Sequence, residues 1–359
     1  MVTPLAHARD ASVYIEAAAK GVDMLLVLPD RGEEGDWPAD LRRLPLPFRG
    51  NSFTQAWVQG LREAVGHFDA DLIHVHNEPW AVTTQRMVMT GKPVVVHSVE
   101  NLYREAPTLY RLRRVNTGYV LRRIAGYLNW GETGLAAARL AGLPSATPQA
   151  VIPASPPSEQ VFSKVQAEQP DRLLKVAFVG RLVREKGVDT VLEALAHPHR
   201  RNSMELMIVG DGPERRRLEF LAQSLGVTAT FRGRLDASAA HAAMVQGHVV
   251  VVPSRSVPRW TEQWGRSAVE AMMTGRPVLV SDSGELPGLV GSAAGVFPEG
   301  DSHALGHRLD AFLADPALVT EWGEAAFERS LAFRPGVLAE QLVAFWDRVL
   351  RTRHRDRQP

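Results

Sequence analysis

The sequence predicts an α/β protein with two domains, each built around a doubly wound parallel sheet. Its 359 residues are enough for two domains of ordinary size, each with a core of its own. Strand-like runs alternate with helical stretches in both halves of the chain, as is typical of doubly wound sheets. Most of these runs are continuously apolar, as expected for parallel strands covered on both faces. The expected strands are Met24–Leu28, Leu72–His76, Pro93–His97, Ala150–Ile152, Lys175–Val179, Glu205–Val209, Thr228–Phe231, His248–Val252, Pro277–Val280 and Gly295–Phe297.

A polar, proline-rich segment separates the two sets of strands. Residues 153–172 (PASPPSEQVFSKVQAEQPDR) have the composition of a linker. We therefore expect a first domain over residues 1–165, a second over 166–334, and a C-terminal helix over 335–359 that ends in a basic tail. The first domain starts late, because residues 1–10 contain no clear buried strand. Its first strand is therefore expected to be either very short or missing.

The bulk composition places the chain among ordinary globular proteins. It is 45% hydrophobic and 23% charged, so neither disorder nor a fibrous class is indicated. The net charge of +1 gives no global reason to expect a nucleic acid as partner. The chain has no cysteine, which excludes disulfides, thiolate metal sites and cysteine nucleophiles. No apolar run reaches the ~18–20 residues of a membrane span and no signal-peptide pattern is visible, so we expect a cytoplasmic enzyme.

Two glutamates, Glu262 and Glu270, flank the predicted entrance of a helix in TEQWGRSAVEAMMTG. A helix entrance offers unpaired backbone N–H groups and the positive end of a dipole, so it attracts a phosphate or another anion. In a continuous helix the two carboxylates would stand about 12 Å apart along the axis. The acid and base of a glycoside hydrolase sit only roughly 5–10 Å apart. The spacing instead suits two carboxylates that bind hydroxyl groups at two separate parts of an elongated ligand. A nucleotide sugar is such a ligand, with its diphosphate at the centre.

A second candidate anion site follows the strand Lys175–Val179, in the loop GRLVREKG. Ligands of open parallel sheets bind beyond the carboxyl ends of the strands, where Arg181 and Lys186 lie. Arginine can grip two oxygens and lysine acts as a point charge, so the pair suits a diphosphate. A solvated loop with ordinary surface charges is the alternative. Two further candidates, Gly210 in GDGP and Arg232 in FRGR, lie in turns that turn geometry alone also explains.

The order of these motifs resembles that of family 4 of the retaining glycosyltransferases, which have the GT-B fold. The matching segments are VAFVGRLVREKGVDTVLEAL, MIVGDGPERRRLEFLAQSLGV, FRGRL and VVPSRSVPRWTEQWGRSAVEAMMTGRPVLVSDSGELPGLVG. Together they cover nearly the whole second domain. The resemblance implies two Rossmann-like domains that face a central cleft, with the nucleotide sugar bound by the second. It also implies that the C-terminal helix, around Pro335–Leu350, returns to the first domain.

The resemblance assigns donor-binding roles to residues of the second domain. Arg181 and Lys186 would hold the donor diphosphate. Glu262 would contact the transferred sugar, and Glu270 the ribose hydroxyls. Trp264 stands where the family more often has a phenylalanine, so the identity of the donor sugar stays open. The expected donor-binding set is Gly180, Arg181, Lys186, Gly210, Arg232, Glu262, Gln263, Trp264, Gly265, Arg266 and Glu270.

In the first domain the match is weaker and rests on DLIHVHNEPW and PVVVHSVENLYREAP. His97 ends a strand at the place where the family has a histidine near the reacting sugar. It therefore joins Glu262, Arg181 and Lys186 as a candidate catalytic residue, with a purely structural histidine as the alternative. The candidate acceptor contacts are His76, Glu78, Asn101 and Tyr103.

We expect neither a metal nor a cofactor. Asp69-Ala70-Asp71 has the Asp-x-Asp pattern of metal-dependent glycosyltransferases of another fold. However, it precedes the strand Leu72–His76, at the edge opposite the expected ligand site. The twelve histidines show no metal-ligand spacing on a recognisable helix face.

The segment Tyr110–Trp130 interleaves arginines with aromatic and aliphatic residues. Such a segment suits peripheral contact with the anionic inner face of a membrane. It also suits a pair of helices of the first domain whose arginines lie in water.

The resemblance implies a hexosyltransferase-type enzyme. It would move a sugar from a nucleotide-diphosphate sugar to a hydroxyl of a glycan, lipid-linked or small-molecule acceptor, with retention at the anomeric carbon. No metal is needed if Arg181, Lys186 and the helix entrance neutralise the departing diphosphate. The alternatives are a non-catalytic nucleotide-sugar-binding protein, or an epimerase or phosphorylase of the same fold.

Overall fold

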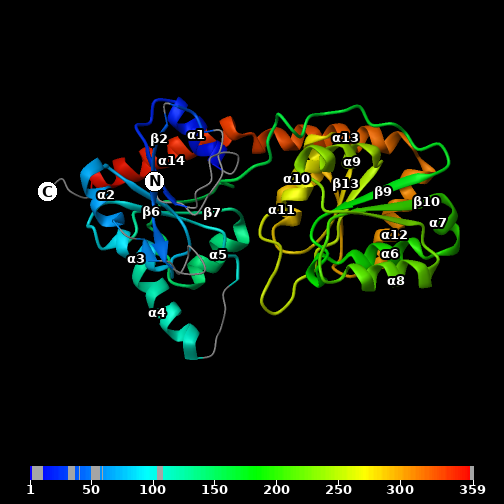
Figure 1. Ribbon diagram of the computed structural model, residues 1–359, viewed down its shortest axis with the longest axis horizontal. Helices are drawn as coiled ribbons and strands as arrows, with labels where there is room; N and C mark the ends of the chain where they lie inside the picture. Colours follow the sequence, from blue (N-terminus) through cyan, green and yellow to red (C-terminus); the bar gives the residue numbers. More distant parts are fainter. Residues whose placement is uncertain are drawn as a thin grey trace. The chain divides into compact units, whose positions relative to one another are not determined.

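The computed structural model describes residues 1, 11–30, 37–39, 41–49, 57–58, 60–102 and 108–355 (Figure 1). The chain divides into two compact units. Unit 1 comprises residues 1–156 and 335–359, and unit 2 comprises residues 157–334. Unit 2 therefore begins upstream of the boundary expected near residue 165, and the segment from Pro335 belongs to unit 1.

Unit 2 contains a six-stranded, fully parallel sheet with the strand order β11-β10-β9-β12-β13-β14. Every strand expected in the second half of the sequence is present, which confirms the doubly wound pattern. The order reverses between β9 and β12, and ligands of such sheets bind at this switch point, beyond the carboxyl ends of the strands. The strands are β9 (Leu174–Val179), β10 (Met204–Val209), β11 (Ala229–Gly233), β12 (Val249–Val252), β13 (Val278–Ser281) and β14 (Gly295–Phe297).

Helices cover both faces of this sheet: α6, α8 and α12 lie on one face, and α9, α10 and α13 on the other (Figure 1). The sheet is buried between them because its strands are almost wholly apolar, as the four valines of β12 illustrate. The helical elements of unit 2 are η2 (Arg184–Lys186), α6 (Val188–Leu195), α7 (Pro198–Ser203), α8 (Arg215–Leu225), α9 (Ala237–Gln246), α10 (Arg266–Met273), α11 (Leu286–Val290), η3 (Gly291–Ala293), α12 (Ser302–Ala314), α13 (Ala317–Ser330) and η4 (Leu331–Phe333).

Unit 1 contains a parallel sheet in the order β5-β6-β7-β8 and a parallel pair β1-β2, with a short antiparallel pair β3-β4. The sequence does not predict β7, because its run GYLN is short and contains glycine and asparagine. Nor does it predict β2, whose run RRLPL is charged and contains a proline. The strands are β1 (Leu25–Pro29), β2 (Arg42–Leu46), β3 (Phe48–Arg49), β4 (Trp57–Val58), β5 (Ile73–His76), β6 (Val94–Ser98), β7 (Gly126–Asn129) and β8 (Gln149–Val151).

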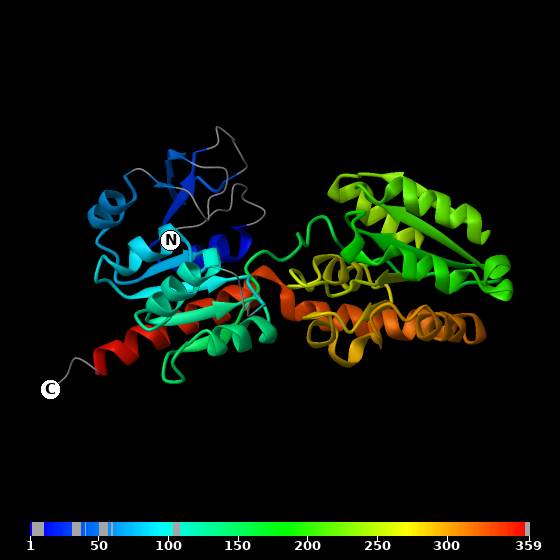
Figure 2. The ribbon, with the colours of Figure 1, turned by 90° about the horizontal axis from the view of Figure 1, so that it is seen from below.

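The last helix, α14 (Pro335–Arg355), packs against α1 (Ser12–Ala19) within unit 1 (Figure 1, Figure 2). Its side of the contact is apolar, with Leu342 and Val349 fully buried. The approach to β7 is close, because a Cβ on Gly126 would lie 2.9 Å from a methyl group of Val349. The other helices of unit 1 are α2 (Leu61–Phe68), α3 (Val82–Val88), α4 (Thr108–Leu121) and α5 (Glu132–Leu140).

The arginine-rich segment Tyr110–Trp130 is not the pair of helices that its pattern suggests. The segment contains most of the helix α4 and, after it, the whole strand β7. Arg122 and Arg123 are exposed, and the Arg123 guanidinium lies 3.9 Å from the centre of the Tyr119 ring. None of the helices described is long and apolar enough to cross a membrane. Contact of this segment with a membrane surface stays a prediction.

Replacement of the buried Arg276 by methionine is expected to destabilise unit 2. The guanidinium donates hydrogen bonds to the carbonyl oxygens of Gly247 at 2.9 Å, Val165 at 2.8 Å and Val245 at 2.8 Å. The arginine is only 2% exposed, so the variant would leave these carbonyls without their donor in a dry environment. A loss of about 3–5 kcal/mol in the free energy of unfolding is expected.

Denaturant unfolding of this variant should be compared with that of Arg201→Met. Arg201 is an exposed arginine of the same unit, whose contact to the Leu225 carbonyl oxygen is long at 3.5 Å. That control is expected to cost less than about 0.5 kcal/mol. Equal losses in the two variants would show that the buried hydrogen bonds of Arg276 contribute little.

Candidate functional site

Three loops meet in backbone contact at the carboxyl edge of the sheet in unit 2. Gly210, after β10, has a φ of +139°, and a Cβ there would lie 1.8 Å from the carbonyl oxygen of Gly180. Gly187, which ends the loop after β9, has a φ of +63°, and a Cβ there would lie 2.0 Å from the carbonyl oxygen of Pro253, after β12. Only glycine tolerates both the positive φ and a carbonyl oxygen so close to the position of a Cβ. Gly187 and the predicted donor residue Gly210 therefore let the three loops approach one another.

An ion pair between Lys186 and Glu262 lies where these loops meet. Lys186 ends the 3₁₀ turn η2, and Glu262 lies in the segment between β12 and α10. The lysine Nζ donates to the Glu262 Oε2 at 2.5 Å, and the Ser254 hydroxyl donates to the same oxygen at 2.7 Å. The Lys186 Nζ also lies 4.8 Å from the centre of the Trp260 ring. The two predicted residues are thus in direct contact, with side chains only 17% and 8% exposed.

The two glutamates flank the entrance of helix α10, as the sequence predicts. Gly265, with a φ of +79°, precedes the helix, so Glu262 lies outside it and Glu270 lies in its second turn. Glu270 accepts a hydrogen bond from the Arg266 Nε at 3.2 Å. Burial raises the pKa of Glu270, and the neighbouring guanidinium opposes that shift. Gln263, between the two glutamates, is half-buried.

Trp264, a member of the expected donor-binding set, has its side chain in the core. Its ring is 4% exposed and packs edge-to-face against Phe333, with 6.3 Å between the ring centroids. A ring packed into the core cannot also contact a donor sugar, so a direct role of Trp264 in choosing the donor is not supported. Arg181 is exposed in the loop after β9, and within the described residues it forms no ion pair. Arg232 is also exposed, and it lines a hollow with Lys175 and Glu205, which lie near the amino ends of their strands.

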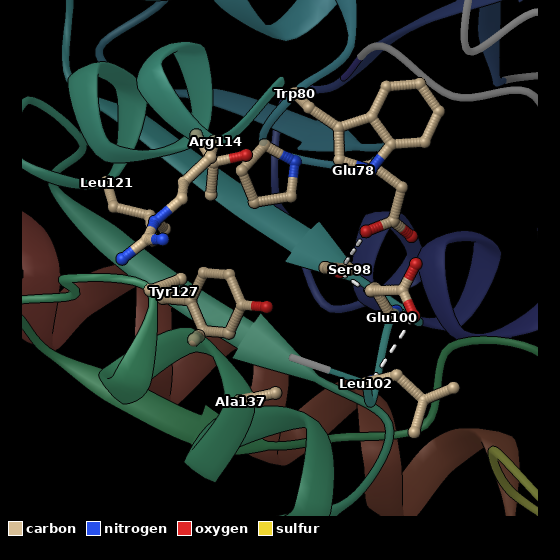
Figure 3. A pocket seen from close by; sticks show the side chains of 13 residues that line it. Glu78, Trp80, Ser98, Glu100, Leu102, Arg114, Leu121, Tyr127 and Ala137 are labelled. Carbon is tan, nitrogen blue, oxygen red and sulfur yellow. Dashed lines mark hydrogen bonds between the residues drawn. The ribbon is translucent and has the colours of Figure 1, made fainter. Parts of the chain in front are cut away.

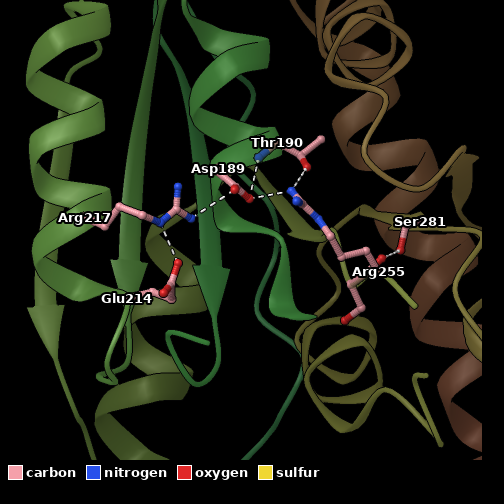
Figure 4. A network of polar contacts seen from close by, with 7 residues as sticks. Asp189, Thr190, Glu214, Arg217, Arg255 and Ser281 are labelled. Carbon is pink, nitrogen blue, oxygen red and sulfur yellow. Dashed lines mark hydrogen bonds and ion pairs between the residues drawn. The ribbon is translucent and has the colours of Figure 1, made fainter. Parts of the chain in front are cut away.

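A network of charged side chains connects the loop after β12 to the amino end of α6 (Figure 4). Arg255 donates to Asp189 at 2.5 Å and to the Thr190 hydroxyl at 2.7 Å. Arg217 donates to the second oxygen of Asp189 at 3.0 Å and to Glu214 at 2.5 Å. The network therefore holds together the two segments that carry Lys186 and Glu262. The sequence does not single out Asp189, in the first turn of α6, or Arg255, three residues after the end of β12.

In unit 1, the predicted acceptor residue Glu78 faces a cavity of about 130 Å³ (Figure 3). The Ser98 hydroxyl donates to the Glu78 Oε2 at 2.5 Å, and the Val99 N–H donates to the Oε1 at 3.1 Å. Glu78 follows β5 and Ser98 ends β6, so the cavity lies at the carboxyl edge of this sheet. Burial raises the pKa of Glu78 to about 7.

His76 and His97 belong to a buried cluster centred on Tyr14, which the sequence does not predict. The Tyr14 hydroxyl lies 3.2 Å from the Nδ1 of each of them, and 3.4 Å from the Nε2 of His74. The His97 Nε2 is 2.7 Å from the carbonyl oxygen of Ile152, and its ring is fully buried. Both ring nitrogens of His97 are therefore engaged within the protein. This arrangement favours the structural alternative for His97 over a contact with the reacting sugar.

The remaining candidates are two predicted acceptor residues and the Asp-x-Asp pair. Asn101 is buried in the segment after β6, and Tyr103 lies outside the described residues. Asp69 forms an ion pair with Lys92 at 2.8 Å, at the amino end of β5. Among the residues described, no group of three histidine, aspartate or glutamate side chains is arranged to hold a metal ion.

Comparisons with known proteins support the resemblance found in the sequence. The family model of glycosyl transferases group 1 matches residues 160–329. A 2-deoxystreptamine glucosyltransferase of Streptomyces kanamyceticus is 30% identical, over 78% of this chain and 80% of its own length. A 2-deoxystreptamine N-acetyl-D-glucosaminyltransferase of Streptomyces fradiae is 28% identical, over 88% of this chain and 87% of its own length.

A solved structure shows that the likeness extends to the whole fold. Alr3699/HepE of Anabaena, in complex with UDP, matches with a TM-score of 0.72 and 18% identity, over 96% of this chain and 98% of that chain. Both parallel sheets of this chain are thus those of a GT-B glycosyltransferase. This chain therefore belongs to the family of glycosyl transferases group 1 and is a glycosyltransferase of that type.

Proposed function

We propose that this protein transfers a sugar from a nucleoside diphosphate sugar to an acceptor hydroxyl, with retention at the anomeric carbon and without a metal. The observation that carries the proposal is the Lys186–Glu262 ion pair beside the entrance of α10. This arrangement sets a cation and a helix N-terminus beside a carboxylate, and a donor presents a diphosphate next to a sugar. The structures of Alr3699/HepE with UDP and with UDP-glucose support a donor of this class.

The departing diphosphate needs positive charge, which this chain can supply from side chains and backbone. Lys186 would be shared between Glu262 and a phosphate oxygen, and the exposed Arg181 lies in the same loop. The first N–H groups of α10 add a fixed dipole that requires no rearrangement during the reaction. These groups do the work that a divalent cation does in metal-dependent transferases.

Retention would follow from attack on the face of the leaving group. The acceptor oxygen bonds to the anomeric carbon, the bond from that carbon to the diphosphate oxygen breaks, and a phosphate oxygen takes the acceptor proton. Glu262 is poorly suited to act as a nucleophile, because Lys186 and Ser254 both donate to one of its carboxylate oxygens. Mass spectrometry of the enzyme during turnover tests this step. A glycosyl group covalently attached to Glu262 would contradict attack on the same face.

A small-molecule acceptor is the class that the comparisons favour. Two of the relatives are named as transferases for 2-deoxystreptamine, a small molecule, and this chain matches most of their length. The cavity at Glu78, of about 130 Å³, also has a size that suits part of a small ring.

The central experiment measures nucleotide release from UDP-, GDP-, ADP- and dTDP-sugars in the presence of EDTA, with and without small-molecule acceptors. Acceptor-dependent release of one nucleotide, unaffected by EDTA, is the expected result. The configuration of the new glycosidic bond, measured by NMR, should match that of the donor. Donor binding without turnover for any acceptor would instead favour a non-catalytic nucleotide-sugar-binding protein.

Replacement of Glu270 by glutamine is expected to reduce the preference for ribose over deoxyribose in the donor. A charged carboxylate accepting hydrogen bonds from ribose contributes roughly 1.5–3 kcal/mol, or about ten- to a hundredfold in affinity. Wild-type protein should therefore bind UDP-glucose at least tenfold more tightly than its 2′-deoxyuridine analogue, and the variant should lose most of this difference. Isothermal titration calorimetry measures the affinities of the two donors for the wild-type protein and for the variant.

The matched control for this experiment is Glu193→Gln, on the exposed face of α6. It should leave both affinities unchanged. If Glu270→Gln keeps the wild-type ratio between the two donors, Glu270 does not bind the ribose hydroxyls.

A further inference from the structure

The cavity in unit 1 is a built site at the carboxyl edge of a parallel sheet. Its walls come from the ends of β5 and β6, from β7 and from helices α4 and α5. Its volume is about 130 Å³. That space suits a small polar group attached to a ring, at the place where open parallel sheets bind ligands.

Glu78 is the polar centre of this cavity. It is 7% exposed, and the two hydrogen bonds from Ser98 and Val99 fix its carboxylate. Two donors directed at the same group favour its ionised form. Within the described part of the chain, Glu78 forms no ion pair. The site therefore holds a buried carboxylate in position without a countercharge of its own.

The charged and titratable groups around Glu78 come from three other elements. Glu100, after β6, adds negative charge on the same side of the cavity, and its charge raises the pKa of Glu78 further. Tyr127 of β7 faces the cavity, and burial raises the pKa of its hydroxyl, so it stays neutral. Arg114 of α4 directs its guanidinium to the opposite side of the cavity from the two carboxyl groups (Figure 3). Helix α5 contributes only alanines.

We propose that this cavity binds the acceptor through an ammonium group paired with Glu78, so that the acceptor is an amino-substituted cyclitol or sugar. The inference rests on the proposed function, because it treats the occupant as the acceptor of sugar transfer. An ammonium group supplies the missing countercharge and forms charge-assisted hydrogen bonds, whereas a hydroxyl supplies hydrogen bonds alone. The aromatic rings of Trp80 and Tyr127 in the wall also favour a cation over a neutral group.

The first test compares three cyclitols that share one ring. Streptamine carries two amines, scyllo-inositol carries hydroxyls at the same positions, and di-N-acetylstreptamine carries neutral amides. Isothermal titration calorimetry with the full-length protein at pH 7.5, without donor, should show streptamine binding at least tenfold more tightly than either neutral compound. Equal affinities, or the absence of streptamine binding, would overturn the proposal.

The second test replaces Glu78 by glutamine, which keeps the shape and removes the charge. The preference for streptamine should disappear, while the affinity for scyllo-inositol should stay within about twofold. Glu63→Gln, on the exposed face of α2, is the matched control and should behave as wild type. Circular dichroism checks that the variant folds. An amine preference that survives in folded Glu78→Gln would show that another group binds the cation.

The pH dependence of binding in the wild-type protein provides a test that requires no variant. Because the pKa of Glu78 is about 7, lowering the pH from 7.5 to 6 protonates it and removes the partner of the ammonium group. The affinity for streptamine should fall about tenfold for each pH unit below 7, while that for scyllo-inositol should not change. A constant ratio between the two ligands over this range would contradict the assignment to Glu78.

Transfer assays separate this inference from the proposed function. Sugar transfer to neutral acceptors, with no preference for streptamine, would overturn the inference and leave the transferase function standing. Binding of streptamine that depends on Glu78, with no transfer from any donor, would uphold the site and overturn the proposed function.

Discussion

Replacement of Lys186 by alanine is expected to lower the rate constant for sugar transfer by about two to three orders of magnitude, the usual effect of removing one preorganised electrostatic group. The ammonium group lies 2.5 Å from Glu262 at the carboxyl edge of the sheet, where the diphosphate would depart. Negative charge on the diphosphate grows as its bond to the sugar breaks, so the loss should appear mainly in kcat. Steady-state kinetics with saturating donor measures it.

The same substitution is expected to destabilise unit 2. A loss of activity in Lys186→Ala alone would therefore not distinguish lost catalysis from lost stability. Without Lys186, the carboxylate of Glu262 loses a direct ion pair in a largely buried position. The cost of removing one partner of a buried ion pair is about 3 kcal/mol. A double variant, Lys186→Met with Glu262→Gln, removes both charges and should recover most of that stability while staying inactive. Thermal unfolding and kinetics on the three proteins together separate the two effects.

The exposed Lys164–Glu324 ion pair in the same unit provides the control. Lys164→Ala should change the unfolding free energy by less than about 1 kcal/mol, because exposed ion pairs contribute little. It should also leave kcat unchanged. If the double variant regains both stability and activity, the Lys186–Glu262 pair serves only to hold the loops together, and the diphosphate is neutralised elsewhere.

The second half of the sequence predicts its own structure well because its signals are local. Six predicted runs become the six strands of the sheet in unit 2, and the most deeply buried of them, such as β12 and β13, are almost wholly apolar because both of their faces are covered. Helix α10 begins between Glu262 and Glu270, where a glycine in the left-handed region permits the turn. The direct contact between Lys186 and Glu262 spans 76 residues, and no local pattern contains it.

Two candidate site residues, Trp264 and His97, have side chains that are buried within the protein. Position at a strand end or beside a helix entrance places a residue at the functional edge, but it does not say which way the side chain points. Trp264 turns into the core against Phe333, and His97 turns toward Tyr14. The partners in both cases are distant in sequence: Tyr14 lies 83 residues before His97. The strand β7 is missed for another reason: its run GYLN is short and not continuously apolar, and its burial comes from tertiary packing, such as that of Gly126 against Val349 and Phe345 of α14.

The cluster around Tyr14 holds three histidines in their neutral form. Trp346 can only donate, so its Nε1, 2.9 Å from the His74 Nδ1, leaves the proton of that ring on Nε2, facing the Tyr14 oxygen. His97 donates through Nε2 to the carbonyl oxygen of Ile152, so its Nδ1 accepts the Tyr14 proton. The remaining lone pair of the Tyr14 oxygen then accepts from the Nδ1 of His76. Every hydrogen bond named here therefore has one donor and one acceptor while each of the three imidazole rings carries a single proton.

Burial makes this neutral arrangement sensitive to pH. It lowers the pKa of His76 to about 4, and it lowers the pKa values of His74 and His97 well below the usual value. Positive charge on a neighbouring histidine would lower the pKa values of His74 and His97 further. In the unfolded chain all three have a pKa of about 6.5. Unfolding therefore takes up protons below pH 6.5, and the stability that is fully present above this pH is lost as the pH falls toward the native pKa values.

The expected result is a steep loss of stability in unit 1 between pH 6.5 and 4.5. Each histidine contributes a slope of up to about 1.4 kcal/mol per pH unit, so the three together approach ~4 kcal/mol per unit. Glu78 opposes this change: its pKa is raised to about 7, so its contribution is greatest below its unfolded value and is lost as the pH rises toward 7. One group cannot cancel three, so the net stability must fall on acidification.

Hydrogen exchange of the β5 and β6 amides, corrected for the intrinsic pH dependence of exchange, measures this stability within unit 1 alone. The variant His76→Gln should reduce the slope by about 1.4 kcal/mol per pH unit, because one titrating group is gone. His67→Gln, on the exposed face of α2, should leave the slope unchanged. A stability that stays constant from pH 7 to 4.5 would show that these rings are charged or solvated in the native protein. The network of Tyr14 would then have to be assigned with protonated histidines.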